Sequence, residues 1–182
     1  MTGKTHKQAG IAAALGTSML PAAKKLIQNV GTEEGLTLTL IFVISSVAGA
    51  YLSDIDNENS TISKMFPAVS KIITKNHKKV DGFRHRYFFH NLIFALPFFV
   101  LAAILYSKNL VAFSILAGIG IGILSHIVSD WIMSETHLIP FCKRGFSLFH
   151  LEGRPKAQAL LDKVFRYLLY ATNTFLILVR FQ

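Results

Sequence analysis

Seven residues that can bind a metal ion or move a proton are spread along the chain: His6, Asp54, Asp56, His85, His90, His126 and Asp130. Imidazoles and carboxylates are ligands that hard and borderline divalent ions accept in proteins. Four imidazoles and three carboxylates provide enough ligands for two such ions. Two close metal ions polarise a phosphoryl or acyl oxygen and generate hydroxide from water near neutral pH. These residue types predict metal-dependent hydrolysis, provided that the fold brings them together.

Single pairs within this set are weak signals. His126 and Asp130 are spaced i, i+4 and share one helix face, where they could chelate a metal ion or simply hydrogen-bond for helix packing. His85 and His90 cannot share a helix face unless His85 lies in the preceding loop. Acids such as Asp54 often follow an apolar segment because the chain has reached water. The prediction therefore depends on the set, and on the elements that position it.

The composition is that of a membrane protein. Of the 182 residues, 52% are hydrophobic and only 16% are charged, whereas a soluble domain carries about 25% charge. The length predicts a single domain over residues 1–182. One cysteine, Cys142, excludes an internal disulfide and a CxxC zinc site. We predict an all-α integral membrane bundle.

Apolar segments of about the length needed to cross a bilayer, roughly 20 residues, occur four times: 36–53, 90–107, 110–128 and 164–181. A fifth candidate, 8–28, has a shorter apolar core that ends at Lys24 and Lys25. It could cross the membrane, be a re-entrant or half-buried helix, or be a signal peptide. We disfavour the signal peptide because cleavage would remove His6. The bundle is therefore predicted to have four to five transmembrane helices.

The basic residues predict how these spans are oriented. Five crossings place 1–7, 54–89 and 129–163 on one side, with 14 of the 19 lysines and arginines. By the positive-inside rule this side is cytoplasmic, so the protein would be a multi-pass membrane protein with its N-terminus inside and its C-terminus outside. All seven candidate ligands then lie at cytoplasmic helix ends. Orientation explains the basic charge, and no nucleic-acid partner is predicted.

Two further segments have a predicted structural role. Residues 62–73 have apolar residues on one face of a predicted helix and lysines on the opposite face, with an interruption at Pro67. This basic amphipathic segment would lie on an anionic membrane surface or pack on the bundle as a lid. Gly118 and Gly122 lie in the apolar run LAGIGIGIL with no strand before it. Small residues at this spacing predict close packing of two membrane helices rather than a phosphate-binding loop.

The order of the motifs resembles that of the bacterial inner-membrane metal-dependent hydrolase family of the YdjM type. The motifs are KTH, LSDIDNENST, HRYFFH, LSHIVSDW and HLIPF, and they extend from His6 to about Phe141. The family's functional positions fall on Thr5, His6, Asp54, Asp56, Ser60, His85, Arg86, His90, His126 and Asp130. The chain departs from the family pattern at Ser53, where proline is usual, and at Tyr87, where glycine is usual. These departures leave every proposed ligand in place but bear on the substrate pocket.

The resemblance implies a small membrane protein with divalent-metal hydrolysis, and its ligand set is similar to that of zinc-dependent phospholipase C enzymes. The first hypothesis is a hydrolase of a phospholipid-like or other phosphoester or acyl substrate at the cytoplasmic interface. Zinc is the preferred metal, with manganese and iron as alternatives; Asp56 or Asp130 would move the proton and Arg86 would hold a phosphate. The alternatives are a non-enzymatic metal-binding or cation-transport protein and a scaffold stabilised by metal. Spans 36–53, 90–107 and 110–128 contain no acids, which favours a site at the helix ends over a conduit.

Overall fold

The structure, a computed structural model, describes residues 1–77, 89–133, 147–149 and 154–180, and every regular element in these ranges is a helix. The all-α prediction is confirmed for this part of the chain. The elements are α1 (Gly3–Ser18), α2 (Pro21–Val30), α3 (Thr32–Leu52), α4 (Thr61–Met65), α5 (Pro67–His77), α6 (Leu92–Leu105), α7 (Leu110–Met133) and α8 (Pro155–Arg180).

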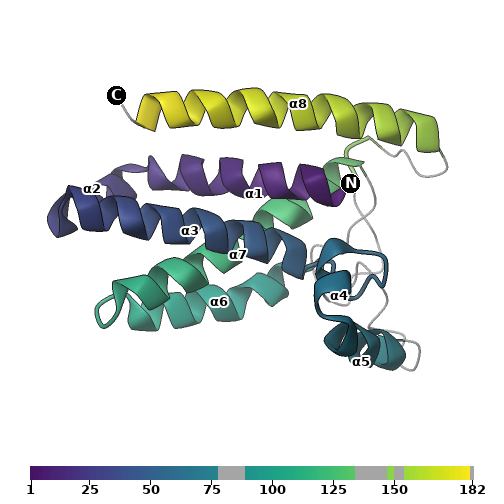
Figure 1. The fold of residues 1–182 in the computed structure, drawn as a ribbon, viewed down its shortest axis with the longest axis horizontal. Helices are drawn as coiled ribbons and strands as arrows, with labels where there is room; N and C mark the ends of the chain where they lie inside the picture. The colour runs from purple at the N-terminus through teal and green to yellow at the C-terminus, as the bar shows by residue number, and fades with distance from the viewer. Residues whose placement is uncertain (78–88, 134–146, 150–153, 181–182) are drawn as a thin grey trace.

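The long helices form a bundle in which α3 and α7 are the central pair (Figure 1). Helix α1 packs against both of them, α6 packs on α7, and α8 lies along α1 on the outside. The start of α1, the end of α3, the start of α6 and the start of α8 lie toward one end of the bundle (Figure 1). This arrangement brings together chain segments that carry the candidate ligands.

Among the described residues, two helices are long and apolar enough to cross a membrane, Thr32–Leu52 and Leu110–Ile132. They contain most of the predicted spans 36–53 and 110–128. Helix α6, within the predicted span 90–107, has 14 residues and is shorter than a usual crossing. The described part of the predicted span 164–181, residues 164–180, forms the last two-thirds of α8. Two qualifying helices are fewer than the four to five predicted from the sequence.

The predicted fifth segment, 8–28, is two helices rather than one. Helix α1 ends at Ser18 and α2 begins at Pro21. Proline is well placed at the first position of a helix because its missing N–H would have no intrahelical partner there, whereas inside a helix it would break the hydrogen-bond ladder. Pro21 therefore marks the boundary between the two helices.

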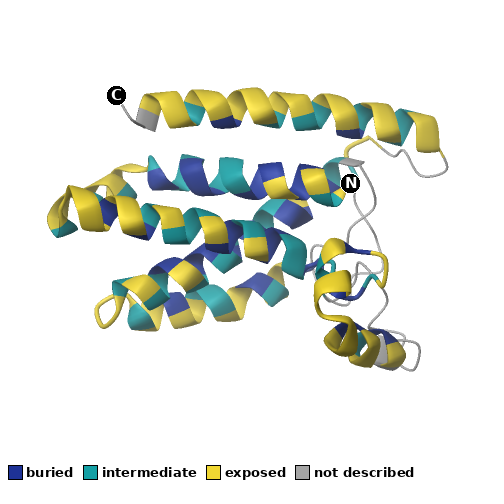
Figure 2. Cartoon of the chain, in the orientation of Figure 1, coloured by how far each residue is buried: buried dark blue, intermediate teal, exposed yellow. Residues whose placement is uncertain are grey.

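The bundle carries apolar side chains outside and polar side chains inside. Leu96, Leu168 and Phe175 are more than half exposed, whereas Thr5 and Ser46 are completely buried. The outward face of α8 is exposed along most of its length (Figure 2). In a bilayer, lipid tails cover the apolar outer surface, while buried polar groups hydrogen-bond to one another. This distribution supports a membrane bundle over a water-soluble domain.

Glycines allow α3 and α7 to approach each other closely. A side chain at Gly118 would collide with the Phe42 carbonyl, and one at Gly122 with the Ser46 carbonyl. On the other helix, a side chain at Gly49 would collide with the Ile119 backbone. The close helix packing predicted from LAGIGIGIL is confirmed.

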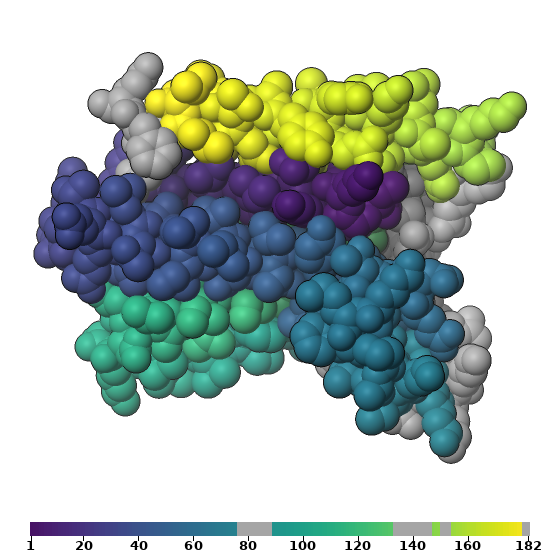
Figure 3. All heavy atoms as spheres, in the orientation of Figure 1, coloured from purple at the N-terminus to yellow at the C-terminus, as the bar shows by residue number. Residues whose placement is uncertain are grey.

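The amphipathic segment forms a lobe at the end of α3, visible in Figure 3 as a projection beside the bundle. Ser60 caps α4 by accepting a hydrogen bond from the Ser63 backbone N–H at 3.2 Å, and the segment breaks between α4 and α5. Met65 and Ile72 are about two-thirds exposed, whereas Ser70 is buried. The apolar face thus points away from the bundle, as expected for a segment that lies on a membrane surface.

Candidate metal centre

Six of the predicted ligands lie in the described residues, and five of them meet at one end of the bundle. His6 comes from the first turns of α1, Asp54 from the turn after α3, and His90 from the turn before α6. His126 and Asp130 lie on the last turns of α7. The three histidines are 0–1% exposed and Asp130 is 3% exposed. His85 and Arg86 lie outside the described residues.

The Asp130 carboxylate is the centre of the cluster. Its Oδ1 lies 3.3 Å from His6 Nε2, and its Oδ2 lies 3.3 Å from His90 Nε2 and 3.5 Å from His126 Nε2. The Met1 amino group lies 3.0 Å from Oδ1. One carboxylate thus faces three imidazole nitrogens, with its two oxygens turned to different rings.

Asp54 closes the other side of the cluster. Its Oδ1 lies 3.8 Å from His90 Nε2 and 3.7 Å from His126 Nε2. Two groups of three ligand atoms each fit within 4.8 Å, namely His6, His126 and Asp130, and Asp54, His90 and His126. The Asp54 side chain is 18% exposed, so it is the most accessible of the five. The cluster is therefore least enclosed on the Asp54 side.

The orientation of His126 is set by the backbone. Its Nδ1 lies 2.6 Å from the Ala50 carbonyl, which can only accept, so Nδ1 carries the hydrogen. In the neutral ring, Nε2 then presents a lone pair to the cluster, where His90 Nε2 is 3.0 Å away. The His6 ring stacks on His126 with centroids 3.7 Å apart. Metal-binding histidines are commonly fixed in this way, by a carbonyl on the nitrogen that does not bind the metal.

His90 is held in the form that binds metals. Burial lowers the pKa of His90 below its usual value because the charged ring would lose its hydration, although a hydrogen bond and the negative charge of Asp130 oppose this shift. The neutral imidazole has a lone pair for a metal ion, whereas the protonated ring has none. Burial therefore prepares His90 to act as a ligand at neutral pH.

Asp56 lies outside both of the three-ligand groups that the described residues form. It is buried, at 5% exposure, and its negative charge favours the protonated form of His90. The sequence predicts Asp56 both as a metal ligand and as a proton carrier, and among the described residues only Asp54 of the DID motif belongs to a three-ligand group.

Sequence reasoning missed two groups that support the centre. One is the Ala50 carbonyl, which carries no residue-specific signal. The other is Asp162 on α8, which accepts hydrogen bonds from Thr2 and Thr5 at the start of α1. In the sequence, Asp162 and Arg166 look like an ordinary i, i+4 pair on a helix surface, and nothing local connects them to His6.

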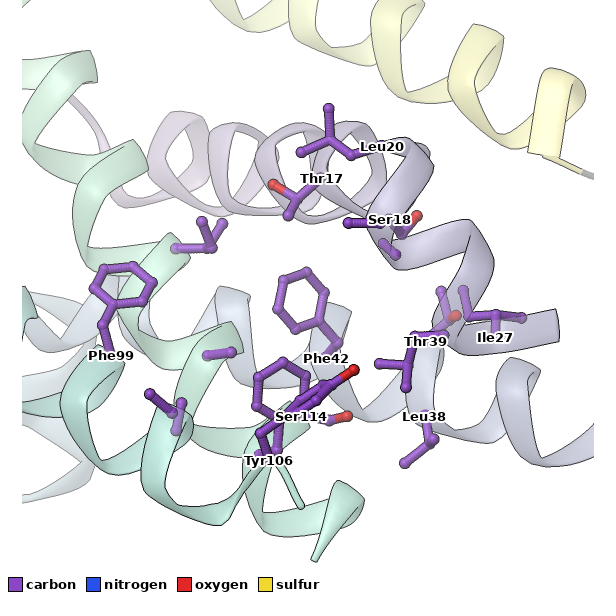
Figure 4. A pocket seen from close by; sticks show the side chains of 18 residues that line it. Thr17, Ser18, Leu20, Ile27, Leu38, Thr39, Phe42, Phe99, Tyr106 and Ser114 are labelled. Atoms are coloured by element: carbon purple, nitrogen blue, oxygen red, sulfur yellow. The ribbon is translucent and has the colours of Figure 1, made fainter. Parts of the chain in front are cut away.

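A separate apolar cavity of about 540 Å³ lies at the opposite end of the bundle. It is bounded by the turn between α1 and α2, the first half of α3 and the region where α6 meets α7, with Phe42, Phe99 and Tyr106 around it (Figure 4). None of the five clustered ligands lines this cavity. It is therefore separate from the metal centre.

Comparison with known proteins decides the family. The family model of the YdjM inner membrane protein matches residues 1–179. The chain belongs to the YdjM inner membrane protein family. The resemblance inferred from the order of the sequence motifs is thus confirmed, and with the apolar helices it supports a location in the membrane.

A relative of this YdjM-family chain is described as "Uncharacterized protein YvsG" from Bacillus subtilis (strain 168). The two are 30% identical over 141 residues, which cover 76% of this chain and 72% of the relative. No solved structure matches the chain. These comparisons establish the family and leave the chemistry to be argued from the site.

Proposed function

We propose that this YdjM-family protein is a membrane-embedded, divalent-metal-dependent hydrolase that acts on an amphipathic substrate at the cytoplasmic interface. The observation that carries the proposal is the convergence of three buried imidazoles on the two oxygens of Asp130. Ionisable groups inside a membrane bundle are costly unless they pair or bind an ion. Three imidazoles and two carboxylates within one buried cluster fit a metal centre better than a set of structural hydrogen bonds.

The ligand geometry supports two ions. His126 belongs to both three-ligand groups, and its Nε2 can bind one ion at a time. With His6, His126 and Asp130 on the first ion, the second would be held by Asp54, His90 and the other oxygen of Asp130. Nitrogen and oxygen ligands of this kind suit zinc, with manganese and iron as alternatives. We therefore expect up to two ions per chain.

The protein's own groups fit hydrolysis of a phosphoester or acyl bond. When bound, divalent ions would polarise the bond that is cleaved and lower the pKa of coordinated water. Asp56, buried beside the ligands, would accept the proton of the attacking water and return it to the leaving group. Arg86 would hold a substrate phosphate through paired N–H donors.

The surroundings of the site favour a lipid-like substrate. The exposed apolar residues of α4 and α5, such as Met65 and Ile72, alternate with exposed lysines, including Lys64 and Lys71. Such a surface lies at the boundary between anionic headgroups and acyl chains. It adjoins the end of α3, from which Asp54 extends. A substrate with its headgroup at the membrane surface would therefore reach the centre without leaving the membrane.

The test is metal analysis and hydrolysis with the full chain in nanodiscs that contain anionic phospholipid. We expect the purified protein to contain stoichiometric zinc, manganese or iron. We also expect it to hydrolyse a phosphoester or acyl lipid from a panel of substrates. This hydrolysis should stop when the metal is chelated and return when metal is added back. A chain without metal that hydrolyses nothing would contradict the proposal. Bound metal with no hydrolysis, together with cation flux in liposomes, would instead favour the metal-binding or transport alternative.

Changing Asp56 to asparagine separates proton transfer from metal binding. Because Asp56 lies outside both ligand groups, Asp56→Asn should keep the metal content of the wild type. Its hydrolysis rate should fall by about 10²- to 10⁴-fold, the usual contribution of a general acid or base. Asp54→Asn is the control, because it should reduce the metal content as well as the rate. Equal loss of metal in both variants would assign Asp56 to the ligands instead.

A further inference from the structure

A buried carboxylate on α8 holds the start of α1. Asp162 is 6% exposed, and its Oδ1 accepts hydrogen bonds from the Thr2 backbone N–H and the Thr5 hydroxyl, both at 2.9 Å. Its Oδ2 accepts a third from the Thr2 hydroxyl at 3.0 Å. Arg166, one turn later on α8, lies 3.9 Å from the same oxygen. Both carboxylate oxygens are therefore engaged by α1, although the two helices are far apart in the sequence.

These hydrogen bonds continue to the backbone of His6. The Thr2 carbonyl accepts from the N–H groups of Thr5, at 2.9 Å, and His6, at 3.1 Å. Thr2 occupies the N-cap of α1, and its hydroxyl caps none of the α1 backbone N–H groups. Asp162 supplies the negative charge that the N-terminus of a helix favours. It fixes Thr2 and Thr5, and through them the first turn, which carries His6.

The place of His6 matters because its contacts in the cluster are short. Its ring stacks on His126 with an interplanar angle of 16°, and its Nε2 lies 3.3 Å from Asp130. Metal–ligand bonds are about 2 Å long and tolerate little displacement. A shift of the first turn of α1 would therefore weaken the group formed by His6, His126 and Asp130 before it affected the group that contains Asp54 and His90.

We infer that Asp162 is a positioning residue that sets the affinity of the centre for the ion bound by His6. This inference rests on the proposed metal centre. Groups that orient metal ligands typically change metal affinity by about 10- to 100-fold when they are removed. One of the two metal-binding steps requires His6, and we expect Asp162→Ala to weaken the affinity of that step by this factor. The affinity of the other step should stay within about threefold of the wild-type value.

Two variants separate positioning from helix packing. Asp162→Asn retains one accepting oxygen for Thr2 and Thr5 and gains an N–H₂ that can donate to the Thr2 hydroxyl, so it should restore affinity close to that of the wild type. Asn173→Ala is the matched control. Asn173 is equally buried on α8 and donates to the Gln8 carbonyl at 3.1 Å and the Gln8 side chain at 2.8 Å. Its loss weakens packing of the same two helices without touching Thr2 or Thr5.

The experiment is a Co²⁺ and Zn²⁺ titration of the full chain in detergent micelles, with thermal unfolding measured with and without metal. His6→Ala identifies the binding step that requires His6. Asp162→Ala and Asn173→Ala should both lower the melting temperature without metal, but only Asp162→Ala should lose metal affinity and metal-induced stabilisation. Equal metal affinity in these two variants would overturn the inference and leave the proposed function standing. A wild type that binds no metal would overturn both.

Discussion

Replacing His126 with alanine should remove the first of the two ions from the purified protein and weaken binding of the second. His126 belongs to both three-ligand groups, so the first ion would be left with His6 and Asp130, and the group around Asp54 and His90 would lose the imidazole beside it. Removal of a group that only orients a ligand already costs about 10- to 100-fold in metal affinity, and loss of the ligand itself should cost more. Metal content after dialysis and titration with Zn²⁺ measure the effect, and hydrolysis should fall with the metal content.

Alanine at position 126 also leaves a cavity, so metal loss must be separated from unfolding. The His126 side chain is fully buried, and its hydrogen bond to Ala50 would be lost. Asp130→Asn has nearly the same shape as the wild-type residue but lacks the negative charge that faces three imidazoles, so it should lose metal with less effect on folding. Helical circular dichroism and gel filtration in detergent show whether each variant is folded.

His90→Ala provides the graded comparison. It removes a ligand from one group only, and His6, His126 and Asp130 remain. We expect this variant to keep one ion where the wild type binds two. If His126→Ala stays folded and binds as much metal as the wild type, the cluster is not the metal site, and the proposed function fails with it.

The sequence predicted the meeting of the ligands because helix ends carry topological information. Alternating spans place the start of one helix and the end of the next on the same side of a membrane. His6, Asp54, His90 and Asp130 lie at or next to such ends in the topology predicted from the sequence, and the structure brings their side chains together. The spacing of Gly118 and Gly122 was similarly informative, because two small residues one helical turn apart leave room for a neighbouring backbone.

Other features could not be predicted because their partners leave no local pattern. The Ala50 carbonyl that orients His126 is backbone, and any residue could supply it. Asp162 is 157 residues from Thr5 in the sequence, and a hydrogen bond between them joins α1 and α8. The spacing of residues along the chain does not predict that these two helices are in contact. The boundary at Pro21 was missed for a different reason. The apolar pattern of 8–28 continues across Pro21, so the pattern predicts one helix. The proline instead begins a second helix.

Gly122→Val should destabilise the bundle and disturb the metal centre at the same time. A Cβ at this position would collide with the Ser46 carbonyl and approach the Ala50 backbone, so α3 and α7 would have to separate. Extra volume in a packed interior costs about 1–3 kcal/mol, and more when the obstacle is backbone. Because the Ala50 carbonyl holds the His126 ring, separation of the helices should also lower metal affinity.

Gly16→Ala is the matched control for this variant. Gly16 lies in α1, and a Cβ there would meet nothing within 4 Å. Alanine is better than glycine inside a helix by about 1 kcal/mol, so the control should be as stable as the wild type or more stable. Thermal unfolding in detergent, with and without Zn²⁺, compares the two variants. Equal melting temperatures for Gly122→Val and Gly16→Ala would mean that the backbones of α3 and α7 are not in close contact. The orientation of His126 depends on that contact.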